Sequence, residues 1–183
     1  MQTIQPIQDE HRDSQTERLL NVVRGELGLT PNMMKRMARS PAALEGYLNL
    51  SGALANGTLD QRLREQIALT VAQANRCEYC LAAHIALGRK AGLTEEEILA
   101  SREARSIDSR SDAALKFVRD LVISRGDLLP ETLRRLRDED YRDGEIVEIV
   151  ALAALNIFGN YFNRVAQTDL DFPRAGLKAR AAA

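Results

Sequence analysis

The stretch DQRLREQIALTVAQANRCEYCLAAHIALGRK, residues 60–90, decides the fold expected for this chain of 183 residues. Apolar residues recur in it with the period of an amphipathic helix, and the polar pair Asn75-Arg76 interrupts the pattern. Asp60 can cap a first helix over about 60–74, and a second helix follows over about 77–90. The stretch therefore predicts two antiparallel helices joined by a short turn.

The helical period continues through most of the chain, and strand patterns are nearly absent. Outside the hairpin we expect further helices over Thr16–Leu27, from Ser40-Pro41 to about Ala55, and over Asp108–Ser124, Pro130–Asp138 and Gly144 to about Thr168. Two more are expected to begin at Thr30-Pro31, with Thr30 as the N-cap, and at the capping box Thr94-Glu95-Glu96-Glu97. These patterns predict an all-α bundle of about eight helices in one domain, 1–183. The weakly patterned end, 174–183, is expected to be a frayed tail.

A weak internal echo suggests that the hairpin has a degenerate copy. Shifting the chain by 83 residues places Glu65 on Glu148 and sets Asn160 and Asn163 on the two cysteines. A copy over about 143–168 would then have kept the helical hairpin and lost its chemistry. Two alanine-rich amphipathic helices also produce such matches by chance, so both explanations stay open.

Composition and charge exclude several classes of protein. The net charge is −1, and no basic block with interleaved aromatic residues indicates binding to nucleic acid or to an anionic membrane. The polar start, MQTIQPIQDEHRDSQ, does not resemble a signal peptide, and no apolar run approaches a membrane span. We therefore expect a cytoplasmic protein, in which a CxxC pair is more often catalytic, redox-active or metal-binding than a structural disulfide.

Both cysteines and a histidine fall within CEYCLAAH, residues 77–84. In an antiparallel hairpin of these two helices, residues whose numbers sum to about 151 lie side by side. Glu65 would then face Ala86, within one turn of His84. Glu65, Cys77, Cys80 and His84 would then converge, with the spacing Glu-x11-Cys-x2-Cys-x3-His. This spacing is more specific than a CxxC pair alone.

Helix geometry predicts separate roles for these four residues. His84 lies about 6 Å along the axis from Cys80 but about 10.5 Å from Cys77, at 1.5 Å per residue. His84 is therefore expected to deprotonate Cys80, while Glu65 orients and charges the histidine. The helix N-terminus should lower the pKa of both thiols.

Three other interpretations of the cluster are open. A structural disulfide between Cys77 and Cys80 would close a very short loop, where the stabilisation is smallest. A zinc ion needs about four ligands. His11 lies in a polar N-terminal stretch outside the cluster and is not expected to supply one. Two core cysteines beside a satisfied histidine would explain neither Glu65 nor the spacing. The redox interpretation is preferred, with the other three left as alternatives.

With these residues, the chain resembles the AhpD-like alkylhydroperoxidases of the carboxymuconolactone decarboxylase superfamily. The resemblance covers most of the chain: it rests on Glu65-x11-Cys77-x2-Cys80-x3-His84, Leu29-Thr30-Pro31-Asn32, LDQRLREQIAL, GLTEEEI and the closing NYFNRVAQTDLDFP, which is similar to the peroxidase-related branch. It implies an all-α fold in trimers or hexamers, a peroxidatic Cys80, a resolving Cys77, and a proton relay through Glu65 and His84.

The chain also departs from the family pattern. Tyr79 stands where some members carry a histidine between the cysteines, so a proton route through that position does not carry over. The decarboxylases of the superfamily lack the cysteine pair, which argues against lactone decarboxylation.

The functional hypothesis is a thiol-dependent peroxidase that needs no bound cofactor or metal. Its substrate would be a hydroperoxide, and its reductant an external dithiol for which the resemblance implies a lipoyl type. The alternatives are a redox sensor or adaptor without sustained turnover, and an enzyme acting on a lactone or other carbon acid. We expect a homo-trimer or homo-hexamer. Met33, Met34 and Met37 are expected in the core or at a subunit contact, with ligand binding as the alternative. Phe158, Tyr161 and Phe162 are expected to pack the core, with one aromatic as an alternative wall of an apolar pocket above Cys80.

Overall fold

The computed structural model describes residues 3–8 and 13–177. Within these ranges the chain forms nine helices and no strand, which confirms the all-α prediction. The helices are α1 (Ser14–Leu27), α2 (Asn32–Met37), α3 (Pro41–Ala55), α4 (Gln61–Ala74), α5 (Glu78–Lys90), α6 (Glu95–Arg102), α7 (Ser109–Ser124), α8 (Pro130–Asp138) and α9 (Asp143–Ala166).

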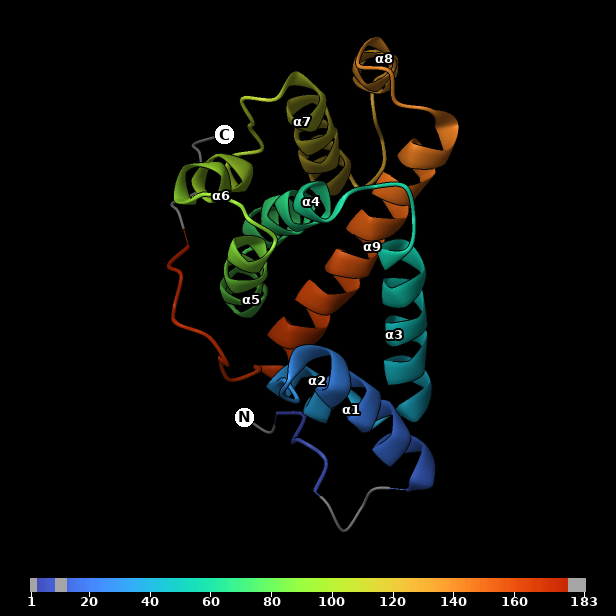
Figure 1. Ribbon diagram of the computed structural model, residues 1–183, viewed down its shortest axis with the longest axis vertical. Helices are drawn as coiled ribbons and strands as arrows, with labels where there is room; N and C mark the ends of the chain where they lie inside the picture. Colours follow the sequence, from blue (N-terminus) through green and yellow to red (C-terminus); the bar gives the residue numbers. More distant parts are fainter. Residues whose placement is uncertain (1–2, 9–12, 178–183) are drawn as a thin grey trace.

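The long helix α9 crosses the molecule and organises the other helices around it (Figure 1). α4 and α5 form an antiparallel pair that packs against one side of α9, and α3 packs against another. α1 and α2 close one end of the molecule, while α7 and α8 lie at the other (Figure 1). The predicted hairpin is therefore the central unit of the fold.

Side-chain caps explain where several helices begin. Ser40, Asp60 and Thr94 each accept a backbone N–H from the first turn of the following helix, as the sequence predicts. Glu97 completes the capping box at Thr94. The prediction for Thr30-Pro31 is wrong by one residue, because Pro31 itself is the extended N-cap residue of α2 and no side chain caps this helix.

A second helical hairpin over about 143–168 is not present, because this stretch is the single continuous helix α9. In the true hairpin, Arg76 leaves the helical conformation with a φ of 55°. Gly159, the position equivalent to Arg76 under the 83-residue shift, stays inside α9. The sequence echo therefore reflects two similar amphipathic patterns rather than two copies of a hairpin.

The core is divided between two clusters that meet at α4. One cluster joins α1, α2 and α5 and includes Leu69 and Ala72 of α4. The other joins α7 and α9 and includes Ile67 and Val71 of α4. Eight of the fourteen residues of α4 are buried, so this helix is held from all sides and can position a polar side chain rigidly.

The segment after α9 runs past α2 and α5 toward α6 (Figure 1). Asp169 forms an ion pair with Arg36 at 2.8 Å, and Arg102 donates a hydrogen bond to the carbonyl of Gly176 at 2.6 Å. The expected frayed tail is therefore wrong for residues 174–177, which contact α5 and α6. Residues 178–183 lie outside the described ranges.

Among the described helices, only α9 is long and apolar enough to cross a membrane, judged by length and composition alone. A core helix of a soluble protein has the same properties, and ten residues of α9 are buried in this protein. The length of α9 is therefore weak evidence for a membrane span.

Candidate active site

The predicted meeting of Glu65 and His84 is confirmed. Nδ1 of His84 lies 2.8 Å from Oε2 of Glu65, and both side chains are largely buried between α4 and α5. Because a carboxylate can only accept, Nδ1 carries the proton and Nε2 is left free to accept one. The pair is thus arranged as a carboxylate-supported base.

Gly88 of α5 lies close to the Glu65–His84 pair. A Cβ atom on Gly88 would lie 3.9 Å from Cβ of Glu65, which is an ordinary contact, and 3.1 Å from Cδ1 of Leu93, which would have to shift. Gly88 therefore leaves room for Leu93, in the loop that follows α5, beside the helix that carries Glu65.

Cys77 is the N-cap residue of α5 rather than its first helical residue. Its Sγ accepts the backbone N–H of Cys80 at 3.3 Å. Both cysteines are free thiols and are buried, with 1% and 5% of their surface exposed. The CxxC pair thus forms the first turn of α5, where the helix dipole favours a thiolate.

The two thiols of the pair differ in acidity. A hydrogen bond from the Cys80 thiol, and then the backbone N–H of Cys80, lower the pKa of Cys77, helped by the charges of His84 and Arg164. The same interaction and burial raise the pKa of Cys80. The expectation that both thiols are acidified is therefore wrong for Cys80, because two adjacent sulfurs cannot both ionise easily.

Two asparagines of α9 contact the pair and were not predicted as site residues. Nδ2 of Asn163 lies 3.3 Å from Sγ of Cys80, and Asn160 accepts a hydrogen bond from Asn75 at 3.0 Å. Hydrogen bonds from both asparagines oppose the rise in the Cys80 pKa. Their signal in the sequence was a group of three amides, with Asn156, in the mainly apolar second half of this helix, because buried amides are costly without a partner.

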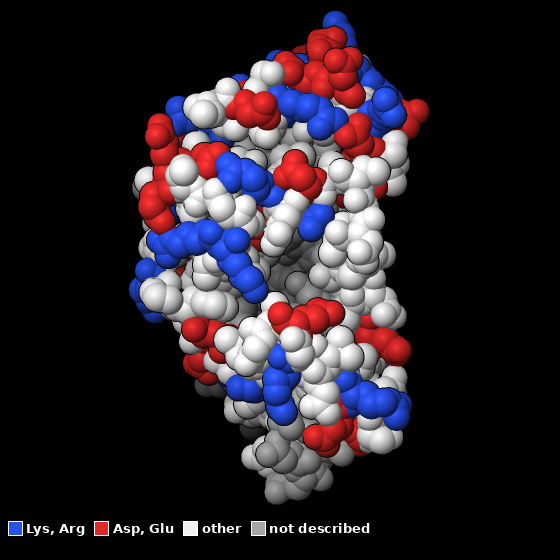
Figure 2. Space-filling model, viewed as in Figure 1, with Lys and Arg blue, Asp and Glu red and all other residues white. Residues whose placement is uncertain are grey.

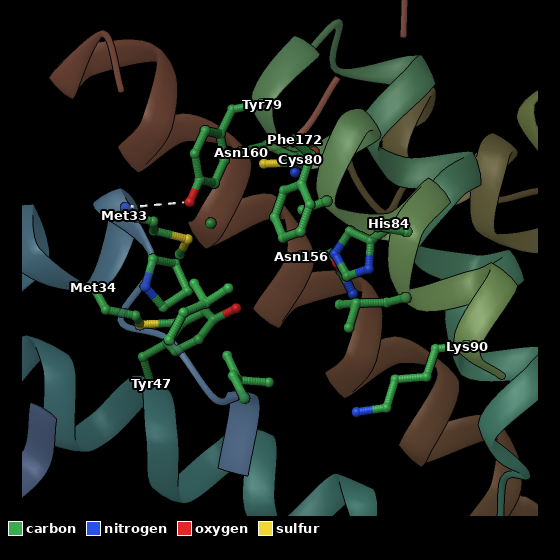
Figure 3. A pocket seen from close by; sticks show the side chains of 17 residues that line it. Met33, Met34, Tyr47, Tyr79, Cys80, His84, Lys90, Asn156, Asn160 and Phe172 are labelled. Carbon is green, nitrogen blue, oxygen red and sulfur yellow. Dashed lines mark hydrogen bonds between the residues drawn. The ribbon is translucent and has the colours of Figure 1, made fainter. Parts of the chain in front are cut away.

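Tyr79, between the cysteines, binds the C-terminal segment. Its hydroxyl donates to Oδ2 of Asp171 at 2.6 Å and accepts the backbone N–H of Met33 at 3.3 Å (Figure 3). Asp171 also accepts the backbone N–H of Asn32 at 2.9 Å. Burial and Asp171 raise the pKa of Tyr79, so its hydroxyl stays protonated as a donor.

A cavity of about 260 Å³ opens beside Cys80 and His84. Figure 2 shows the hollow in this face of the molecule, between α5 and α3 of Figure 1. Most of the side chains that form its wall are apolar, among them Leu27, Leu29, Met33, Met34, Leu87 and Phe172. The cavity suits an apolar molecule that meets the Cys80 sulfur at one end.

The methionines are buried as expected, whereas two of the three aromatic residues of α9 are not. Met33 and Met34 are buried, as predicted, and also line the cavity. Phe158 and Tyr161 are 42% and 58% exposed, so their assignment to the core is wrong. The reason is that they lie on the outer face of α9, which a helical period does not distinguish from the inner one.

Tyr47 of α3 is a further cavity residue that the sequence did not reveal. Its hydroxyl points into the cavity (Figure 3) and has no hydrogen-bond partner among the described residues. Burial and the nearby Cys80 and Glu65 raise its pKa. The phenol is therefore a protonated donor in the cavity that Cys80 also lines.

A second, more open cleft lies on the other side of the pair. It has a volume of about 410 Å³ and is lined by Cys77 together with Arg76, Arg164 and Arg174. The two cysteines thus border different openings, Cys80 the apolar cavity and Cys77 the basic cleft. In the described ranges, no group of three or more His, Cys, Asp or Glu side chains lies close enough together to hold a metal ion.

Comparison with known proteins bears on the family and on the fold. Residues 41–120 match the carboxymuconolactone decarboxylase family. A curated relative, the uncharacterized protein 4 in the cox locus of Paracoccus denitrificans, is 34% identical over 64 residues. That match covers 34% of this chain and 58% of the relative, so the chain spans little more than half of that protein.

Three solved structures share the fold over nearly their whole length. An uncharacterized peroxidase-related protein from Ralstonia eutropha with an alkylhydroperoxidase AhpD core has a TM-score of 0.81 at 20% identity, over 92% of both chains. The debrominase Bmp8, as a cysteine-to-alanine variant in complex with 2,3,4-tribromopyrrole, has a TM-score of 0.80 at 20% identity, over 93% of this chain and 92% of Bmp8. An uncharacterized peroxidase-related protein from Silicibacter sp. has a TM-score of 0.75 at 21% identity, over 90% of this chain and 91% of that protein.

Proposed function

We propose that the chain, whose residues 41–120 match the carboxymuconolactone decarboxylase family, is an AhpD-like member of that superfamily and a cytoplasmic, thiol-dependent peroxidase that reduces organic hydroperoxides. The observation that carries the proposal is the apolar cavity in which Cys80 lies beside the Glu65–His84 pair, with Cys77 one turn away. No bound cofactor is needed, because the two thiols supply both electrons.

In the first step, Cys80 attacks the terminal oxygen of the hydroperoxide. Its proton passes to Nε2 of His84 or to the Cys77 thiolate, and the O–O bond breaks as the S–O bond forms. The departing alkoxide takes a proton and leaves as an alcohol, and Cys80 becomes a sulfenic acid. We assign this step to Cys80 because Cys80 lines the cavity, although Cys77 is the more acidic of the two thiols.

In the second step, the Cys77 thiolate attacks the sulfenic sulfur of Cys80. The S–O bond breaks, hydroxide takes up a proton to leave as water, and a disulfide forms. The lowered pKa of Cys77 suits this role, since only the thiolate is nucleophilic.

An external dithiol then returns the pair to the thiol state. It attacks one sulfur of the disulfide to form a mixed disulfide, and its second thiol completes the exchange and leaves as the oxidised reductant. The cleft beside Cys77 offers a route for this reductant that the substrate does not occupy.

Two other activities remain candidates. A redox sensor is favoured by the hydrogen bond of Tyr79 to Asp171, because disulfide formation would move the turn to which the C-terminal segment is attached. Removal of a halogen from an aromatic compound is favoured by the fold shared with a debrominase and by the aromatic residues Tyr47, Tyr79 and Phe172 in the cavity wall.

One set of assays separates these functions. Wild type and Cys80→Ser would each be supplied with tert-butyl hydroperoxide, cumene hydroperoxide or hydrogen peroxide. The reductant would be dithiothreitol or dihydrolipoamide. A peroxidase consumes many equivalents of hydroperoxide and Cys80→Ser consumes none. A sensor stops after one equivalent, and a dehalogenase leaves hydroperoxides intact but releases bromide from a bromopyrrole. A carbon-acid enzyme keeps its activity when both cysteines are replaced by serine.

A further inference from the structure

We propose that the substrate is a hydroperoxide on an apolar chain that ends in a carboxylate, with the carboxylate bound by Lys90. This inference rests on the proposed peroxidase function and adds the class of substrate. The two ends of the cavity carry different chemical groups, the Cys80 thiol at one end and the Lys90 ammonium at the other.

The cavity follows one face of α5 from its first turn to its last residue. Cys80, Ala83, His84, Leu87 and Lys90 all line it, and their spacing of three or four residues places them on one side of the helix. Cys80 and Lys90 are ten residues apart, which is about 15 Å along a helix axis. In Figure 3, Cys80 and Lys90 lie at opposite ends of the cavity, with His84 between them.

Lys90 is suited to bind an anion. Among the described residues that line the cavity, Lys90 is the only Lys or Arg, and none is Asp or Glu. No described residue forms an ion pair with Lys90, whereas its neighbour Arg89 is paired with Glu95 at 2.5 and 3.0 Å. Because Lys90 is exposed at the rim, a carboxylate bound there keeps much of its hydration.

The wall between the two ends is suited to an alkyl chain. Met33, Met34, Leu87 and Phe172 present apolar surface along it, and methionine side chains adapt to chains of different shape. At the inner end, the unpartnered hydroxyl of Tyr47 can donate a hydrogen bond to the hydroperoxide (Figure 3). An extended molecule with a carboxylate at one end and a hydroperoxide along its chain therefore matches the cavity from Lys90 to Cys80.

The turnover test compares linoleic acid hydroperoxide with its methyl ester, using dithiothreitol as reductant. Wild type should have the lower KM for the acid, and Lys90→Gln should reduce this preference about 1.5- to 5-fold, the range for an exposed ion pair. Raising the salt concentration should have the same effect in wild type. Arg89→Gln removes an adjacent positive charge outside the cavity wall and should keep the preference.

A binding test does not depend on peroxidase activity. Titration calorimetry of the reduced protein with dodecanoate and with its methyl ester should show tighter binding of the acid, and Lys90→Gln should abolish the difference. If no hydroperoxide is turned over but this pattern holds, the peroxidase function is wrong and the carboxylate site stands. Equal binding of acid and ester by wild type, or an equal loss in Arg89→Gln, would overturn the assignment of Lys90.

Discussion

At the scale of the residue, the site depends on how one proton is distributed between Cys77 and Cys80. The cap position and the hydrogen bond from the Cys80 thiol favour charge on Cys77, whereas the cavity gives the substrate access to Cys80. The acidic thiol and the accessible thiol are thus different residues. The Glu65–His84 pair is needed because Cys80 does not ionise readily by itself.

Removing either cysteine should separate the two steps. Cys77→Ser should still permit one oxidation, leaving a sulfenic acid on Cys80 that dimedone traps and mass spectrometry locates, with turnover lost. Cys80→Ser should abolish hydroperoxide reduction. A sulfenic acid on Cys77 in Cys80→Ser, formed as fast as in the other variant, would contradict the assignment of Cys80 as the nucleophile.

Variants of the relay should fall in a definite order. His84→Ala removes the base and should lower the rate of Cys80 oxidation by roughly 10²–10⁴, the usual contribution of general-base catalysis. Glu65→Gln should lower it less, because the amide can still accept a hydrogen bond from Nδ1 but carries no charge. Rates of sulfenic acid formation would be measured by stopped flow, with the exposed Glu95→Gln as the control. A larger loss in Glu65→Gln than in His84→Ala would be inconsistent with this relay.

The shared proton predicts a pH dependence. A thiol with a lowered pKa is reactive above that pKa and loses reactivity as the pH falls through it. Cys80→Ala removes the hydrogen-bonding thiol, so the pKa of Cys77 should rise toward that of an ordinary thiol. The rate of Cys77 alkylation by iodoacetamide, followed against pH, should shift to higher pH in Cys80→Ala. An unchanged profile would mean that the backbone N–H alone acidifies Cys77.

At the scale of the element, the close approach of α4 and α5 holds the relay together. α4 is packed on all sides, so the position of α5 relative to it sets the distance between Glu65 and His84. A Cβ atom on Gly88 of α5 would lie 3.9 Å from Cβ of Glu65 and 3.1 Å from Cδ1 of Leu93. The hairpin is therefore part of the catalytic geometry as well as of the fold.

Gly88→Ala should disturb both stability and activity. The added Cβ would crowd Leu93, at a cost of about 1–3 kcal/mol in the free energy of unfolding, measured with urea. Displacement of α5 should also slow Cys80 oxidation. The control is Gly52→Ala in α3, where a Cβ meets nothing within 4 Å and helix propensity should add about 0.5–1 kcal/mol. If Gly88→Ala is as stable and active as wild type, the close approach is not needed.

At the scale of the whole molecule, one face of α9 is left without a partner. Its exposed apolar residues recur at helical spacing and form a stripe: Val147, Val150, Phe158, Tyr161 and Val165. Next to it, Leu50 of α3 and Phe158 border a shallow apolar groove. An exposed apolar surface of this kind is typical of an interface between subunits. We propose that a second copy of the chain covers it.

Light scattering should therefore return the mass of a homo-oligomer, most simply a trimer or a hexamer. Val165→Glu, in the stripe, should shift the mass toward the monomer, because a buried unpaired charge destabilises the interface. Ile107→Glu, at an even more exposed apolar residue outside α9, should leave the mass unchanged. A wild-type monomer of about 20 kDa at micromolar concentration would contradict the proposal.

The sequence by itself determined the helices, most of their caps and the meeting of Glu65 with His84. Each depends on local information: a 3.6-residue period, a capping residue, and the pairing of positions across a short turn. The same local information misled where a helix has two apolar faces. It placed Phe158 in the core, and it left open a degenerate hairpin copy where α9 is one continuous helix.

Only the tertiary structure decided what surrounds the cysteines. Tyr47, Asn163 and Phe172 reach the site from three distant segments, and no period in the sequence relates them to Cys80. The division of charge between Cys77 and Cys80 also depends on burial and on hydrogen bonds from α9. The physical reason is that the pKa of a buried group is set by everything packed around it, whereas helical periodicity specifies only which face of each helix is buried.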